Sequence, residues 1–446
     1  MSVPFGPNVL SFADITEEIR CTFASFTDAR RGKNTQYTLV DAGLSAFSVF
    51  FMQSPSFLEY QRSLEQAHGR NNAQTLFGVH AIPSDNQIRT LLDATEPERL
   101  KPLFYSLFQS LQQAGVLDMY RDVNHSLLVA LDGTDDFSSK TIHCPNCSTR
   151  EHANGQVRFF QTALTAVLVK PGREKVIALA PEFVRPQDGA QKQDCELNAA
   201  KRWLAESGAA LSPLNVTLLG DDLFCHEPFC RQVLGQGLNF ILVCKPSSHT
   251  IVDEWLAFLQ RSDGIRTLVC SRWTGRRHET DTDRDAQTLP LCNGKDALTV
   301  NWCEITTTDE NGKVLYRNSF ATSWPLDDKA VVEVVAAGRS RWKIENENNN
   351  VLKTKGYHFE HNYGHGQQHV AAVLASLIIL AFLVHTVLEG MDDQYQLLRQ
   401  KLPSRQRLFS DIRTLTSYLC FNTWVDLMAF MLKSFEPAPP AKPRTG

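Results

Sequence analysis

Residues 126–135 read SLLVALDGTD, and this stretch decides the fold class that the sequence predicts. Its apolar run ends at Asp132 and is followed by Gly and Thr, which is typical of a buried strand that ends in a turn. A second apolar run, NVTLLGD (215–221), ends in the same way at Asp221. Residues just past the carboxyl ends of strands line the ligand crevice of an α/β sheet. We therefore expect Asp132 and Asp221 to lie close together.

The segments around these two runs predict the rest of the sheet. Residues 157–170 and 175–184 read as two further strands joined by a Pro-Gly hairpin signal. A helix is expected over 194–207, and NFILVCK (239–245) reads as another strand. The order of elements is β-β-β-α-β-α-β, which predicts an α/β fold with a mixed sheet covered by helices.

The composition is that of an ordinary globular protein. Of 446 residues, 43% are hydrophobic and 21% are charged, and the net charge is −4. These values exclude a chain disordered throughout, a collagen-like chain and a protein coated in positive charge. The 11 cysteines are dilute over this length, and the N-terminus shows no pattern of a secretory signal. We therefore expect reduced thiols and a cytoplasmic location.

One apolar stretch, Val370 to Leu388, is long enough to be considered as a membrane span. It contains His385, and Ser376 and Thr386 interrupt it. Its flanks lack the basic cluster and the aromatic belt that mark membrane-spanning helices. We predict a helix buried in a large core, and no membrane partner.

Changes of pattern along the chain predict its organisation. Helical periodicity dominates before residue 126, alternating strands follow residue 263, and helices return after residue 326. The predicted divisions are a helical region that could contact DNA (1–125), the first part of the core (126–263), a β-rich insertion (264–325), the second part of the core (326–390), C-terminal helices (391–433) and a Pro-rich disordered tail (434–446).

A third acidic residue lies in a helix-like segment that begins after Gly338. There Arg341 and Glu345 are four residues apart and share one helical face. A surface ion pair is the simplest interpretation of this spacing. However, Glu345 stands beside four asparagines, which are poor helix formers. This cluster of amides favours contacts with a ligand such as phosphate.

Carboxylates that meet at one edge of a sheet repel one another unless a cation lies between them. Mg²⁺ is the usual cation, because it binds hard carboxylate oxygens and leaves room for water and phosphate. The alternative is that each aspartate is an ordinary turn or cap residue, since Asp135, Asp136 and Asp222 are immediate neighbours. Composition alone does not decide between these interpretations.

Three segments, taken in their order along the chain, resemble the DDE transposases of bacterial insertion sequences, and most closely their IS-four-like branch. The segments are LVALDGTD, LLGDDLF and GRSRWKIENENNNVLK. The resemblance covers residues 126–390. It implies an RNase H-like core interrupted by a β-strand insertion domain, with a helical N-terminal region. The catalytic and metal-binding residues would be Asp132, Asp221 and Glu345. Asp221 is preferred to Asp222 because an aromatic residue follows it by three positions, as in the family.

The family motif around the glutamate has Tyr, Arg, Glu and Lys at fixed spacing. Arg341 and Glu345 match this motif. The tyrosine position holds Gly338, and the lysine position holds Leu352, with Lys353 one step later. The DNA contacts that the resemblance implies are assigned to Arg341, Lys353 and Lys355.

The activity that the resemblance implies is DNA transposition. Such an enzyme cleaves DNA at the ends of its insertion sequence and joins the freed 3′ ends to target DNA, with two Mg²⁺ or Mn²⁺ ions held by the three carboxylates. Its partners would be the transposon terminal repeats and target DNA, bound by a homodimer in a synaptic complex. Two alternatives stay open: a degenerate transposase that binds DNA without cleaving it, and an RNase H-like metal-dependent nuclease.

A separate pattern of cysteines raises a structural zinc site. Cys144 and Cys147 have metal-ligand spacing, and such a site needs four ligands. Cys225 and Cys230, shortly after Asp221, could supply the other two if the loops that follow the two strands meet. The alternative is that these thiols are packing residues.

Overall fold

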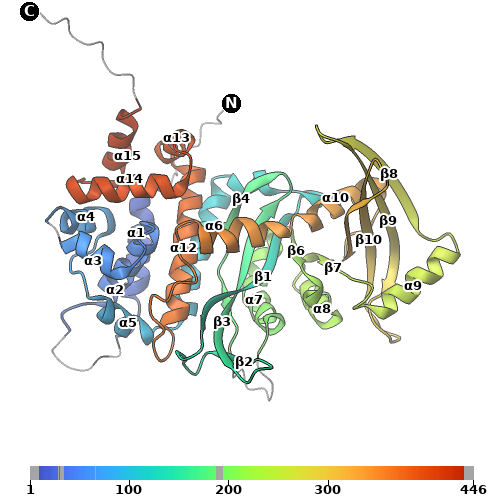
Figure 1. The fold of residues 1–446 in the computed structure, drawn as a ribbon, viewed down its shortest axis with the longest axis horizontal. Coiled ribbons are helices and arrows are strands. Elements are labelled where there is room, and N and C mark those ends of the chain that lie inside the picture. Colours follow the sequence, from blue (N-terminus) through green and yellow to red (C-terminus); the bar gives the residue numbers. More distant parts are fainter. Residues whose placement is uncertain (1–9, 29, 31–34, 66, 187–193, 436–446) are drawn as a thin grey trace, which may run out of the picture. The chain divides into compact units, whose positions relative to one another are not determined.

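The computed structural model of the chain describes residues 10–435 except 29, 31–34, 66 and 187–193. The chain divides into two compact units (Figure 1). A helical unit comprises residues 1–114 and 352–446, and a sheet unit comprises residues 115–351. The tail predicted to be disordered, 434–446, lies outside the described residues from position 436 on.

The sheet unit is built on one mixed sheet of 11 strands, with the strand order β2-β3-β1-β6-β7-β11-β10-β9-β8 and with β4 and β5 paired to β3. Its first seven strands are β1 (Leu127–Ser139), β2 (Ser148–Glu151), β3 (Val157–Lys170), β4 (Arg173–Ala178), β5 (Glu182–Phe183), β6 (Val216–Gly220) and β7 (Asn239–Val243). β1 pairs antiparallel with β3 and parallel with β6, and β6 pairs parallel with β7. The predicted mixed α/β fold is therefore confirmed.

Helices cover this sheet and connect its parallel strands. They are α7 (Glu196–Leu211), α8 (Glu227–Gly235), α9 (Thr250–Arg261) and α10 (Asp328–Arg339), with the short helices η2 (Val116–Tyr120), η3 (Val123–His125), η4 (Ser212–Leu214), η5 (Asp222–Phe224) and η6 (Ile344–Asn349). α7 packs against β1, β3 and β5, and α8 and α10 pack against β7. Trp203 anchors α7, since its indole is buried and its Nε1 donates to the Ala180 carbonyl at 3.0 Å.

The region predicted as a β-rich insertion, residues 264–325, forms strands but not a sheet of its own. The strands are β8 (Arg266–Trp273), β9 (His278–Pro290), β10 (Thr299–Asp309) and β11 (Val314–Thr322). β11 pairs antiparallel with β7 through Phe320 and Val243, so that the four strands extend the same sheet. The physical reason is that β7 would otherwise end the parallel part of the sheet with unpaired backbone groups, which β11 satisfies.

The helical unit combines the two ends of the chain. Its helices are α1 (Phe12–Ala24), α2 (Leu39–Phe51), α3 (Phe57–Glu65), α4 (Ala67–Phe77), α5 (Asp85–Asp93), η1 (Pro97–Leu100), α6 (Lys101–Gln113), α12 (Val370–Met391), α13 (Asp393–Lys401), α14 (Arg405–Tyr418) and α15 (Trp424–Lys433), while α11 (Asn350–Thr354) spans the division. The predicted core segment 326–390 is therefore divided at residue 351. α12 packs against α2, α5 and α6 of the N-terminal region, because it is apolar on nearly every face and α2 offers a matching buried surface.

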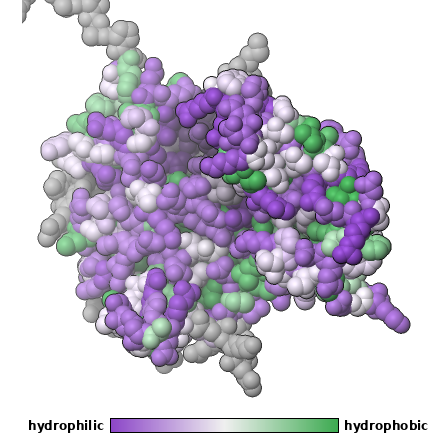
Figure 2. Space-filling model, turned by 45° about the vertical axis from the view of Figure 1, so that its right-hand side comes forward, coloured by the Kyte–Doolittle hydropathy of each residue, from purple (hydrophilic) through white to green (hydrophobic). Residues whose placement is uncertain are grey.

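α12 is long and apolar enough to cross a membrane by length and composition, but 89% of its most apolar window is buried inside the protein. His385 in this helix is buried, and burial holds its pKa well below the usual range, so that the imidazole is neutral. Its Nδ1 lies 2.6 Å from the Tyr357 hydroxyl, and its Nε2 lies 3.0 Å from the Phe51 carbonyl oxygen. On the face drawn in Figure 2, hydrophilic residues predominate and hydrophobic ones occur in small groups. The prediction of a core helix agrees with this arrangement.

We expect the full-length chain to stay in the supernatant when expressing cells are lysed without detergent and centrifuged at high speed. The reason is that α12 already buries its apolar faces against helices of its own unit. Immunoblotting of the supernatant and pellet measures this. Recovery in a membrane pellet that withstands an alkaline carbonate wash would contradict the assignment of α12 as a core helix.

Candidate functional site

The register of the central strands brings Asp132 and Asp221 together. β1 and β6 pair in parallel from Leu127 with Val216 to Ala130 with Leu219. Continuing this register by two residues places Asp132 beside Asp221, which follows the last residue of β6. The sequence predicted that the strand ends at Asp132. This was wrong, because β1 continues to residue 139 along β3.

Glu345 reaches the same edge of the sheet from η6, a single π-helical segment of the sequence IENENN. η6 contacts β1, β3 and β4. Arg341 donates from Nη2 to Glu345 Oε1 at 2.7 Å, as the four-residue spacing predicted. Single π-helical turns inside helices are rare and are frequent at functional sites.

The pKa of Asp132 depends on the charges of the neighbouring acidic groups. Burial raises the pKa of Asp132 to about 7, the Arg341 guanidinium opposes this rise, and the negative charges of Glu345, Glu196 and Asp221 add to it. A carboxylate in such surroundings is half protonated near neutral pH. Among the described residues, the ligand atoms of Asp132, Asp221 and Glu345 are not all within 4.8 Å of one another. The three groups therefore lie near enough for their charges to interact, but they do not form a compact set of ligands.

Glu196 is a fourth acidic residue of this site, and sequence reasoning missed it. It is the first residue of α7, and burial, then the charges of Asp221 and Asp135, raise its pKa. Its carboxyl group lies against Gly133, where an added Cβ would stand only 2.2 Å from the carboxyl carbon. The glycine after Asp132 thus leaves the space that Glu196 occupies. The only sequence signal was an acidic residue in a first helical turn, where such residues are common for other reasons.

Asn349 was also missed as an individual site residue, although the amide cluster around it was noted. Its Nδ2 donates to Asp132 Oδ2 at 3.0 Å, and its Oδ1 accepts from Thr165 Oγ1 at 3.0 Å. Thr165 is the β3 residue paired with Asp132. Asn349 and Asn348 are buried, so at least part of the amide cluster faces the protein. Asn349 fixes the orientation of the Asp132 carboxyl group.

Asp221 and its neighbour Asp222 have different partners. Asp221 Oδ1 caps η5 by accepting from the Leu223 backbone N–H at 3.0 Å, and its charge acts on Asp132 and Glu196. Asp222 Oδ1 instead accepts from the Lys245 backbone N–H at 2.7 Å. The choice of Asp221 as the site residue stays a prediction.

The two departures from the family motif have different structural settings. Gly338 lies against the Phe320 ring, where an added Cβ would stand 2.7 Å from a ring carbon, so a tyrosine does not fit there without displacement. Leu352 is buried. Lys353 and Lys355 belong to the helical unit, in which Lys353 Nζ pairs with Glu360 Oε1 at 2.8 Å.

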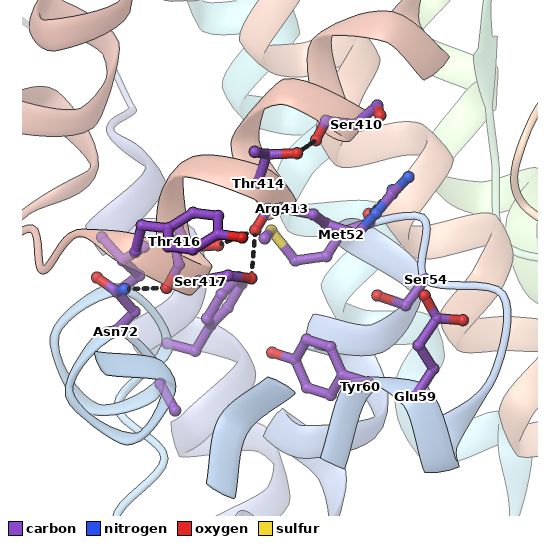
Figure 3. Close-up of a pocket in the computed structure, with 14 residues that line it drawn as sticks. Met52, Ser54, Glu59, Tyr60, Asn72, Ser410, Arg413, Thr414, Thr416 and Ser417 are labelled. Carbon is purple, nitrogen blue, oxygen red and sulfur yellow. Dashed lines mark hydrogen bonds between the residues drawn. The ribbon is translucent and has the colours of Figure 1, made fainter. Parts of the chain in front are cut away.

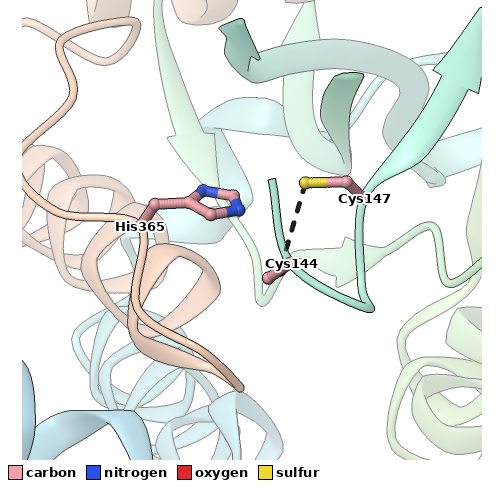
Figure 4. A group of neighbouring side chains, drawn as sticks. All are labelled: Cys144, Cys147 and His365. Carbon is pink, nitrogen blue, oxygen red and sulfur yellow. Dashed lines mark hydrogen bonds between the residues drawn. The ribbon is translucent and has the colours of Figure 1, made fainter. Parts of the chain in front are cut away.

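The four cysteines predicted as zinc ligands do not converge. Cys144 and Cys147 face each other across a turn with their sulfur atoms 3.9 Å apart (Figure 4), and they pack with Phe137. His365, drawn in the same figure, belongs to the other unit. Among the described residues, Cys225 groups instead with Cys244 and His249.

A cavity of about 420 Å³ lies in the helical unit, between the end of α2, α3, α4 and α14 (Figure 3). Arg413 Nη1 donates to the carbonyls of Met52 and Gln53 at 2.6 and 2.9 Å. Asn72 Nδ2 donates to the carbonyls of Thr416 and Leu419 at 2.8 and 2.7 Å. These polar groups bind the helices to one another, so they serve the packing of the unit.

Comparison with protein-family models finds none that matches this chain, and comparison with curated proteins finds no match either. The functional argument therefore depends on the geometry of the carboxylate site.

We expect Asp132→Asn to stabilise the metal-free protein more at about pH 8 than at about pH 5. The folded-state pKa of about 7 exceeds the roughly 3.9 of an unfolded aspartate, so the native state binds the proton more tightly. The contribution of the Asp132 carboxyl group to the free energy of unfolding is therefore lost as pH rises from about 4 to about 7. Asparagine does not ionise, so the variant does not lose stability in this way. The gain at the higher pH should be on the order of 1 kcal/mol or more, measured by denaturant unfolding.

The matched control is Glu254→Gln, which changes an exposed carboxylate on α9. Its effect on the free energy of unfolding should be small and the same at both pH values. Equal effects of Asp132→Asn at the two pH values would contradict the electrostatic description of the site.

Proposed function

We propose that this protein is a DNA transposase that cleaves DNA at the ends of an insertion sequence and transfers the freed strand into target DNA. The observation that carries the proposal is that Asp132, Asp221 and Glu345 come from three separate elements of the sheet unit and lie near enough for the charges of Asp221 and Glu345 to act on Asp132. Their order along the chain and the Arg341–Glu345 pair agree with the resemblance to DDE transposases.

The donor set fits a divalent cation. Asp132, Asp221 and Glu345 offer carboxylate oxygens, which are the ligands that Mg²⁺ and Mn²⁺ prefer. Burial and mutual repulsion raise the pKa values of Asp132 and Glu196, and positive charge between the groups would relieve that repulsion. We assign the cation to Asp132, Asp221 and Glu345, with Glu196 next to them. When bound, two such ions supply an activated water and stabilise the leaving 3′ oxygen in phosphodiester cleavage.

The residues around the carboxylates position them. Asn349 holds one oxygen of Asp132, and we assign the other oxygen to the cation. Arg341 holds Glu345 and brings positive charge to the acidic cluster. A phosphate of DNA that approaches this edge meets Arg341, which can form charge-assisted hydrogen bonds with it. Phosphoryl transfer depends mainly on such positioning and charge neutralisation.

The test is cleavage of labelled DNA that carries the ends of the element, taken from the sequence that flanks the gene, with Mg²⁺ or Mn²⁺. The native chain should give products with 3′-OH ends. Asp132→Asn and Glu345→Gln should lower the rate by roughly 10²–10³-fold or more, because each removes a carboxylate worth several kcal/mol at the transition state. Gel separation of the labelled strands measures the rate.

Glu347→Gln is the matched control, since it changes a glutamate of the same π-helical segment that has no assigned role in the site. It should cleave like the native chain. Intact cleavage by Glu345→Gln would contradict the carboxylate assignment. Binding of the ends without cleavage by the native chain would favour a degenerate DNA-binding protein, and cleavage without strand transfer would favour a nuclease.

Glu196→Gln should shift the acid limb of the pH–rate profile to lower pH. The physical reason is that Glu196 raises the pKa of Asp132, so its removal lets Asp132 lose its proton at lower pH. The measurement is the rate of metal-dependent cleavage across the pH range.

Glu206→Gln, on the exposed face of the same helix α7, is the control and should leave the profile unchanged. A profile that does not move with Glu196→Gln would remove Glu196 from the site and leave the assignment of the other three carboxylates standing.

A further inference from the structure

A cluster of sulfur and nitrogen ligands lies on the other side of the Asp221 loop. Cys225 follows η5, Cys244 follows β7, and His249 precedes α9. All three side chains are buried, and their ligand atoms lie within 4.8 Å of one another. β6 and β7 are parallel neighbours, so their carboxyl ends bring the loops with Cys225 and Cys244 to the same edge of the sheet.

The spacing is close to that of a tetrahedral zinc site. With metal–sulfur bonds of about 2.3 Å, two thiolates at tetrahedral positions stand about 3.8 Å apart. Ligand atoms that all lie within 4.8 Å of one another need only small side-chain adjustments to reach that spacing. Two thiols and one imidazole are a ligand set that selects Zn²⁺ among the common divalent metals.

The buried ring nitrogen of His249 is suited to coordinate a metal ion. His249 is only 7% exposed, and its Nε2 has no hydrogen-bond partner among the described residues. That atom lies 3.3 Å from Asp222 Oδ1, an ion-pair distance at which the geometry falls short of a well-formed hydrogen bond. An unpaired buried ring nitrogen costs free energy, which coordination of a metal would recover.

The two thiols also have no other assigned role. None of the described cysteines forms a disulfide, and Cys225 and Cys244 are both buried. Binding of Zn²⁺ to this pair would release the two thiol protons to solvent and leave two thiolates on the metal. The proton release makes affinity rise with pH.

We propose that Cys225, Cys244 and His249 bind one Zn²⁺ ion in a structural site that ties the loop after β6 to the end of β7. The fourth position falls to Asp222 or to water. A cavity of about 480 Å³, lined in part by Cys225, His226 and His249, gives the metal a path from solvent.

The site lies close in sequence to the proposed catalytic residues. Asp221 caps the η5 helix, and Cys225 is the residue that ends it. A metal at Cys225 would thus hold the loop that carries Asp221. The assignment of the zinc site depends only on the thiols and the imidazole, and it does not depend on transposition.

The experiment uses the full-length protein, purified with its thiols reduced. Zinc content is measured by mass spectrometry of the metal, and Co²⁺ is titrated into zinc-free protein as a spectroscopic probe. We expect one zinc per chain and a thiolate-to-cobalt charge-transfer band. Cys244→Ser and His249→Gln should each weaken zinc binding by more than the roughly 10- to 100-fold lost when an outer-shell partner is removed.

Cys147→Ser is the matched control, because it changes a buried thiol with a cysteine neighbour outside the proposed site. It should keep the full zinc content and the cobalt band. Circular dichroism checks that each variant is folded. As a readout that needs no variant, zinc should protect Cys225 and Cys244 of the native chain from alkylation, mapped by peptide mass spectrometry.

Three results would overturn the proposal. The first is a folded native chain that takes up neither zinc nor cobalt. The second is zinc binding that survives both Cys244→Ser and His249→Gln. The third is loss of zinc in Cys147→Ser with retention in Cys244→Ser, which would move the metal to the Cys144–Cys147 pair.

Discussion

Repulsion among acidic side chains at one edge of the sheet is the constraint on which the arrangement of the sheet unit depends. Asp132, Glu196, Asp221 and Glu345 come from four different elements, and each raises the electrostatic energy of at least one other. Only rigid backbone structure can hold like charges together against this repulsion. The hydrogen-bond ladders of the sheet and the packing of α7 and η6 on β1 supply that rigidity. Arg341 and Asn349 offset a part of the repulsion, and a proton on Asp132 near neutral pH offsets more.

The topology explains why these groups meet at all. The parallel pairing of β1 and β6 puts Asp221 at the level of Asp132, while the antiparallel partner β3 runs on past that level. At Asp132, β1 therefore still pairs with β3 on one side, while its pairing with β6 on the other side has ended. Thr165 on β3 and Asn349 on η6 fill the closed side, and Glu196 approaches beside Gly133. The result is a carboxylate that Asn349 holds in place and on which the charges of the other acidic groups act.

The sequence allowed the strands before and after this edge to be predicted, because buried strands leave continuous apolar runs that end in turn residues. Asp132 and Asp221 followed from that pattern, and Glu345 from the spacing with Arg341 and the resemblance. Glu196 could not be predicted, since an acidic residue that begins a helix is ordinary and only the tertiary fold brings it to Gly133. The extent of the sheet was also missed. Strand pairing between β7 and β11 joins residues about 80 positions apart. No local sequence pattern shows whether the strands of an insertion form a separate sheet or extend the sheet of the core.

The cysteines also show that local sequence spacing does not reveal which residues the tertiary fold brings together. Cys144 and Cys147 have the spacing of metal ligands, but their sulfurs lie 3.9 Å apart beside Phe137 and do not group with Cys225 or Cys230. Cys225, Cys244 and His249 have no recognisable spacing, because a whole helix and a strand separate the first two. They meet because β6 and β7 are parallel neighbours whose ends share one edge. A loop at such an edge has no ladder to hold it, so its position depends on side-chain contacts. Asp222 already supplies one by accepting from the Lys245 backbone. A metal held by the cysteines and His249 would supply a second on the same loop, and the position of Asp221 would then depend on both.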